Sequence, residues 1–339
     1  MKKRRNRLSL DIPILLIITA AVCILKSIAA LGALNYQTGH YDSKVIISLA
    51  NWILVIGGLG LFLKGLFDVR QSKPIPSFHT PASYIPMSLV CLSLLFLGFG
   101  LLKKRAAIIE STPFGRSPSS ITSVITLCAI VAFLAALSGF IYVALEGVRD
   151  HRRAICGLLI ILFISLYVIY LYLSNELPIN APNKITDEVA LALAALFFLY
   201  EVRISLGREV WHAYSAFGYI SALLLAYSSI PAIAVYFING QVIANSIYES
   251  AFTLTLFIFI IARLILLSEF VCEEDTAYVK AIAEAYRKRI NAVADTDGGA
   301  AEAALNTEMR EDEDNQQIMI DAVMPTKPTY DGEEERNDI

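Results

Sequence analysis

The stretch ITSVITLCAIVAFLAALSGFIYVAL, residues Ile121–Leu145, carries no charged side chain along its whole length. A helix needs about 20 apolar residues to cross the hydrocarbon core of a bilayer, because it rises only about 1.5 Å per residue. The run also lacks the alternation of apolar and polar residues that a membrane-spanning β-barrel strand requires. The stretch therefore predicts a transmembrane helix.

Seven further apolar stretches are long enough to cross a bilayer in the same way. They run from Ile12–Leu34, Val45–Phe67, Ala82–Leu102, Ala154–Ser174, Val189–Leu206, Ala213–Phe237 and Ser246–Leu267. Hydrophobic residues make up 56% of the 339 residues and charged residues only 17%, which is outside the range of ordinary soluble domains. The predicted fold class is all-α, a polytopic transmembrane bundle of eight helices over residues 1–270.

Lysine and arginine placement predicts how the bundle is oriented in the membrane. The chain opens with Lys2, Lys3, Arg4, Arg5 and Arg7, and the even-numbered loops carry Arg70, Lys73, Arg149, Arg152, Arg153, Arg203 and Arg208. Eight crossings then predict a cell-membrane protein with both termini in the cytoplasm. One loop after the third stretch disagrees, because it places Lys103, Lys104, Arg105 and Arg116 outside.

The first stretch has a second interpretation, as a cleaved signal peptide. A basic start precedes an apolar run, and Ala30 and Gly32 are small residues of the kind found at cleavage sites. The run is long for a signal, and Asp11 interrupts its basic flank. Cleavage would leave seven helices with an unchanged orientation.

The chain changes character after Phe270. Residues 271–294 are predicted to form a juxtamembrane amphipathic helix, with Val279, Ile282, Tyr286, Ile290 and Val293 on one face. Roughly 18 of the 31 acidic residues but only about 7 of the 28 basic residues follow Val271. Residues 295–339 are therefore predicted to be an acidic, disordered cytoplasmic tail.

Polar residues inside the apolar stretches form the first candidate site. Lys26 and Asn51 fall at similar depths below the predicted outer ends of their helices, and Glu249 enters its helix near the same outer boundary. Charge within the hydrocarbon is costly and usually faces a partner or water. We therefore expect Lys26 to face the bundle interior and to contact Asn51 or Glu249.

A repeated spacing provides the second candidate. Asp68-Val69-Arg70 precedes His79 by the same offset that separates Glu201-Val202-Arg203 from His212. One interpretation is a duplication in which helices one to four are equivalent to helices five to eight, with these residues at a repeat interface. The other is that charged residues are simply common where helices leave the membrane, and the spacing leaves both open.

Motifs for catalysis or cofactors do not stand out. The five cysteines form no CxxC pair, and there is no HExxH, P-loop, dinucleotide-binding or GxSxG motif, so no enzymatic activity, cofactor or metal is expected. The expected partners are the lipid bilayer and a cytoplasmic protein that binds the tail, with no nucleic acid. A non-enzymatic membrane sensor or scaffold is the first function predicted, and a small-solute transporter with a polar site between two four-helix halves is the alternative.

Overall fold

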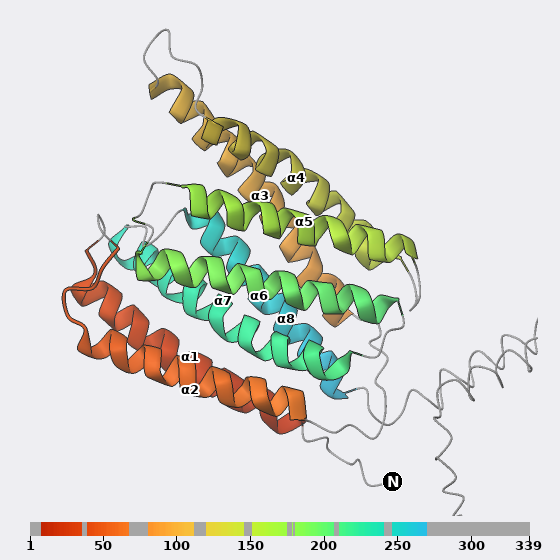
Figure 1. The fold of residues 1–339 in the computed structure, drawn as a ribbon, viewed down its shortest axis with the longest axis horizontal. Helices are drawn as coiled ribbons and strands as arrows, with labels where there is room; N and C mark the ends of the chain where they lie inside the picture. Colours follow the sequence, from red (N-terminus) through yellow and green to blue (C-terminus); the bar gives the residue numbers. More distant parts are fainter. Residues whose placement is uncertain are drawn as a thin grey trace, which may run out of the picture. The chain divides into compact units, whose positions relative to one another are not determined.

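The computed structural model of this chain describes residues 8–35, 39–67, 81–111, 120–145, 151–174, 178, 180–206, 210–240 and 246–269 (Figure 1). The predicted amphipathic segment 271–294 and the acidic tail 295–339 lie outside the described residues. The described part is built of α-helices, and they are α1 Leu8–Ala33, α2 Val45–Phe67, α3 Pro81–Ser111, α4 Ser120–Ala144, α5 His151–Leu173, α6 Pro182–Ser205, α7 Trp211–Asn239 and α8 Ile247–Glu269. The all-α, eight-helix fold predicted from the sequence is confirmed.

Two helices extend seven or more residues beyond a predicted end, because charged residues continue the helix past the apolar run. α3 extends to Ser111, so the segment Lys103–Arg105 is helical, and its prediction as a loop is wrong. α6 begins at Pro182, seven residues before the predicted Val189. Proline suits the first turn of a helix, where its missing N–H would have no intrahelical partner.

Six helices pack in a closed ring in the order α3, α4, α5, α6, α7, α8 and back to α3. The hairpin of α1 and α2 packs outside this ring against α7, and α1 also touches α8. Figure 1 shows α1 and α2 on one side of α5–α8 and the α3–α4 pair on the other. α6 and α7 pack together, whereas the equivalent pair in a four-plus-four duplication, α2 and α3, forms no such interface among the described residues. The packing order therefore differs from the order that the duplication predicts.

Neighbouring helices of the ring run antiparallel, which gives the bundle two ends. The Glu201 end holds the first residues of α1, α3, α5 and α7 and the last residues of α2, α4, α6 and α8. The Asp187 end holds the opposite termini. Contacts across the bundle agree with this arrangement, since Gly157 near the start of α5 lies beside Val202 near the end of α6.

Seven of the eight described helices are long and apolar enough to cross a membrane, and α6 is the exception. Its 24 residues include Lys184, Asp187, Glu188, Glu201 and Arg203. The apolar helices carry large hydrophobic side chains on outward faces, as α2 does with Trp52, Val55 and Ile56. Exposed apolar surface on this scale suits contact with lipid. The chain is a multi-pass membrane protein.

Small residues allow α2 to approach its neighbours closely. A Cβ atom built on Gly65 would lie 2.6 Å from the Cα atom of Ala216 in α7, and one built on Gly57 would lie 2.9 Å from Ile18 in α1. Nothing lies within 4 Å of the same position on Gly60. Close approach of backbones through small residues is a common way for helices to associate in membranes.

Candidate functional site

Two carboxylates share the buried face of α6. Asp187 and Glu201 are 14 residues apart, about four helical turns, so they fall on the same side of the helix. Ala190, Ala194 and Phe198 are buried between them on that face. The face carries one acidic group towards each end of the bundle.

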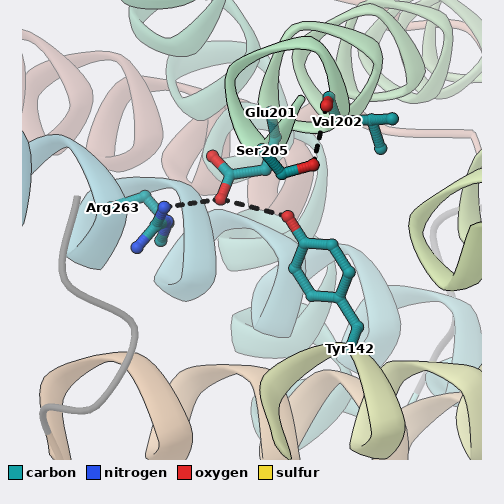
Figure 2. Close-up of polar contacts among 5 residues, drawn as sticks. All are labelled: Tyr142, Glu201, Val202, Ser205 and Arg263. Atoms are coloured by element: carbon teal, nitrogen blue, oxygen red, sulfur yellow. Dashed lines mark hydrogen bonds and ion pairs between the residues drawn. The ribbon is translucent and has the colours of Figure 1, made fainter. Parts of the chain in front are cut away.

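Glu201 lies in a fully enclosed polar cluster at its end of the bundle (Figure 2). Its Oε1 atom accepts a hydrogen bond of 2.6 Å from the Arg263 guanidinium of α8, and the exposed fractions of the two side chains are 0% and 1%. The Tyr142 hydroxyl of α4 donates to the same oxygen at 3.4 Å. The cluster therefore connects three helices of the ring through one carboxylate oxygen.

A second buried guanidinium adjoins this cluster. Arg153, in the first turn of α5, is 0% exposed, and its guanidinium carbon lies 4.5 Å from the centre of the Tyr142 ring. A guanidinium over an aromatic face is stabilised by the ring quadrupole. Arg153 was predicted to be a loop residue that orients the bundle, but the structure places it inside the bundle.

Aromatic side chains fill the ring between its two ends. Phe163 of α5 packs edge-on against Phe252 of α8 with ring centres 5.6 Å apart, and Phe198 of α6 stacks on Phe259 of α8 at 5.2 Å. These side chains are buried and belong to the main hydrophobic core. The layer separates the Glu201 cluster from the polar groups at the other end.

A small cavity opens at the Asp187 end between α5, α6, α7 and α8. It is lined by Tyr167, Leu171, Asp187, Leu191, Ser228, Glu249, Ser250 and Thr253. The space open to the centre of a water-sized sphere is about 20 Å³, which is enough for about one water molecule. The Ser228 hydroxyl donates a hydrogen bond to Asp187 Oδ1 across the α6–α7 interface. Most of the lining is oxygen-bearing, which is unusual for a site within an apolar bundle.

Glu249 is held by the start of α8. The Ser246 N–H donates to Glu249 Oε2 at 3.1 Å, and the Glu249 N–H donates to Ser246 Oγ at 3.4 Å. This reciprocal pair is a capping box, encoded by the sequence Ser246-Ile247-Tyr248-Glu249. The same carboxylate that caps the helix therefore also lines the cavity.

Lys26 is buried next to this region, with 3% of its surface exposed. Its ammonium donates to the Tyr227 carbonyl oxygen of α7 at 3.0 Å and lies 4.1 Å from the centre of the Tyr227 ring. The Tyr227 hydroxyl in turn donates to Asn51 Oδ1 of α2 at 2.6 Å. Lys26 is thus connected to Asn51 through Tyr227 rather than directly, and the Asp187 carboxylate lies within its electrostatic range.

The structure does not gather the predicted site residues into one place. Lys26 and Asn51 share the Tyr227 network, whereas Glu249 lines the cavity. Of the predicted repeat interface, Glu201 is buried, Arg203 is exposed on the same helix and His212 lies in the first turn of α7. Asp68, Arg70 and His79 lie outside the described residues.

Several residues of the two polar regions were not predicted from the sequence. They are Asp187, Tyr142, Arg153, Tyr167, Ser228 and Arg263. Asp187 was missed because the predicted helix began at Val189, which left this carboxylate in a loop. The spacing of Asp187 and Glu201 on a face that also carries Ala190 and Ala194 was the signal that could have found it.

The fold and these buried polar groups define the class: a multi-pass helical membrane protein with charged side chains enclosed at both ends of a six-helix ring. No family model, no curated protein and no solved structure matches the chain. No group of three histidine, cysteine, aspartate or glutamate side chains that could hold a metal ion occurs in the part of the chain that the structure describes.

Proposed function

We propose that this protein is a membrane carrier for a small polar solute or ion, with its binding site in the cavity at the Asp187 end. The observation that carries the proposal is the lining of that cavity: two carboxylates and four hydroxyl-bearing side chains within a bundle whose interior is mostly apolar. Buried polar groups are expensive in a membrane and usually mark a solute or ion pathway. The proposed role is transport rather than catalysis.

The packing of the ring supports a carrier that is closed at the Glu201 end. Between the cavity and that end lie the aromatic layer and the ion pair of Glu201 with Arg263. A solute in the cavity could reach the Glu201 end only if α6 and α8 separated there. Alternating access of this kind needs an element with two discrete arrangements, and the ion pair is the contact that would break.

We also propose that both termini face the cytoplasm, in the cell membrane. The basic residues Lys2–Arg5, Arg7 and Arg152 support this orientation, although Arg153 is buried and adds nothing to the loop charge. In this orientation the Glu201 end is cytoplasmic and the cavity faces outward.

The test is cysteine accessibility in sealed vesicles. Ser250→Cys places a thiol in the cavity, in a chain whose five native cysteines are replaced by alanine and whose thermal unfolding is unchanged. A carrier should react with a membrane-impermeant maleimide from both sides of the membrane. Lys44→Cys, exposed in the loop before α2, is the control that should react from one side only. Labelling of Ser250→Cys from one side under every condition would contradict a carrier.

A membrane sensor or scaffold with a partner-binding tail is the second candidate, and the charge of the chain favours it. The excess of acidic residues after Val271 would suit a basic cytoplasmic partner. Deletion of residues 295–339 separates the two functions, because a carrier should keep its two-sided labelling while a scaffold should lose capture of its partner from a cell extract.

A further inference from the structure

We propose that the cavity at the Asp187 end is a binding site for a small monovalent metal cation such as Na⁺ or Li⁺. This inference rests on the proposed carrier function and names the class of its ligand. The candidate ligands come from four helices: Tyr167 of α5, Asp187 of α6, Ser228 of α7, and Glu249 with Thr253 of α8. They are oxygen donors, which hard cations prefer.

The Tyr167 hydroxyl is the observation that points to a ligand rather than to a purely structural cluster. Its side chain is 1% exposed and lines the cavity, and its oxygen atom makes no hydrogen bond of normal length among the described residues, although it faces the Glu249 carboxylate. A buried hydroxyl without a partner costs about 1–3 kcal/mol in protein mutational data. A cation in the cavity would accept the lone pairs of this oxygen.

The other donors are fixed in place by the fold. Asp187 is oriented by the Ser228 hydroxyl, and Glu249 by the capping box with Ser246. Thr253 follows Glu249 by one helical turn, and its hydroxyl is hydrogen-bonded to the Glu249 carbonyl oxygen at 3.1 Å. Donors that are already positioned lose less conformational entropy when they bind an ion.

Size and charge together select the ion. A cavity with space for about one water molecule admits a dehydrated ion of similar or smaller size but not an organic solute. Lys26 lies within electrostatic range of Asp187 and offsets part of its negative charge. The nearby Glu188 is likewise offset by Lys184. A single positive charge therefore suits the site better than a divalent ion with its demand for several carboxylates.

The experiment measures thermal unfolding of the full-length protein in detergent, in sodium, lithium or choline chloride at equal ionic strength. A ligand that binds the folded state raises the unfolding temperature, and the shift grows with the logarithm of the ligand concentration above Kd. Sodium or lithium should therefore stabilise the wild-type protein relative to choline. Asp187→Asn should weaken this effect by about tenfold or more in cation concentration, and Tyr167→Phe by about threefold to tenfold.

Glu188→Gln is the matched control, because it removes an acidic group next to Asp187 that does not line the cavity. It should keep the sodium or lithium effect. If Asp187→Asn does not fold, Tyr167→Phe and Ser228→Ala still test the site, since each removes one hydroxyl. No difference between sodium, lithium and choline in the wild-type protein overturns the proposal. A cation effect that persists in Asp187→Asn also overturns the proposal. So does stabilisation that changes with pH but not with the cation, because it would identify a proton as the ligand.

This result is separable from that of the accessibility experiment. Cation-dependent stability together with labelling of Ser250→Cys from one side only would leave a cation site in a protein that is not a carrier. Labelling from both sides without any cation effect would leave a carrier whose ligand is of another class.

Discussion

Glu201 and Arg263 form a fully buried ion pair of 2.6 Å near the carboxyl-terminal ends of α6 and α8 (Figure 2). Within the ring of six helices these two are not neighbours in packing order, so the pair spans the interior. The pair links the two helices that flank α7 at one end of the ring, as Asp187 and Ser228 link the adjacent helices α6 and α7 at the other.

Glu201→Gln should destabilise the protein by about 3–5 kcal/mol, because it leaves the Arg263 guanidinium buried without its counter-charge beside that of Arg153. The double variant Glu201→Gln with Arg263→Met should recover much of this loss, since it removes both buried charges. Arg203→Gln changes an exposed charge on the same helix and should have an effect within about 0.5 kcal/mol. Denaturant unfolding in detergent measures all three, and a double variant less stable than the single one would contradict the interpretation.

Gly65→Ala should lower stability by about 1–3 kcal/mol, because the added Cβ atom would overlap backbone atoms of Ala216 and push α2 away from α7. Gly60→Ala is the control on the same helix. It meets nothing within 4 Å and should leave stability unchanged or raise it by up to about 1 kcal/mol through helix propensity. Equal effects of the two substitutions would show that α2 and α7 are not in close contact at Gly65.

Lys26→Met should strengthen the cation effect proposed above. The ammonium group lies within electrostatic range of Asp187, so it repels a cation in the cavity, and its removal lowers the concentration of sodium or lithium needed for stabilisation. Lys26→Arg keeps the charge and should change this concentration much less. The measurement is the same thermal titration, and an unchanged or weaker cation response in Lys26→Met would contradict the electrostatic link between α1 and the cavity.

Reporter fusions test the proposed orientation. Fusions after His40, His151 and Ile339 should report outside, inside and inside, because eight crossings return the chain to the side where it began. The fusion after His40 follows α1, and the fusion after His151 lies at the start of α5. An external carboxyl terminus would exclude eight crossings, and α6, the least apolar helix, would be the first to re-examine.

The number and approximate positions of the helices could be predicted from the sequence, because about 20 apolar residues in a row have few alternatives in a membrane protein. Val45–Phe67 was predicted to the residue. The ends of α3 and α6 could not be, since lysines at 103–104 and Asp187 with Glu188 look like loop residues until the packing around them is known. Mean hydropathy describes a segment as a whole, whereas the burial of one charged side chain depends on which helix packs against it.

Hydropathy also does not show which residues of distant helices meet at the site. Lys26 was identified as a buried charge, but its partners Tyr227 and Asp187 belong to helices about 160 or more residues further along the chain, and nothing local connects them. Arg263 stands near the end of an apolar run, a position where an arginine commonly reaches towards the lipid headgroups, and the sequence alone does not mark it as buried. Only the contact between α8 and α6 across the ring interior shows that its guanidinium points inward.

The composition of α6 also has a consequence for how the protein is made. The five charged residues of α6 lie towards its two ends, where each costs less on insertion than the about 2.5–3.5 kcal/mol of a charge at the helix centre, but together they leave α6 too polar to enter lipid readily by itself. Its Glu201 acquires the Arg263 partner only after α8 has been synthesised, more than 60 residues later. Assembly of the ring interior therefore waits for the last helix, and a ribosome-bound chain that ends before α8 holds an unpaired carboxylate within the nascent bundle. Quality-control factors that survey membrane proteins for exposed charge would meet this chain in that state until its translation is complete.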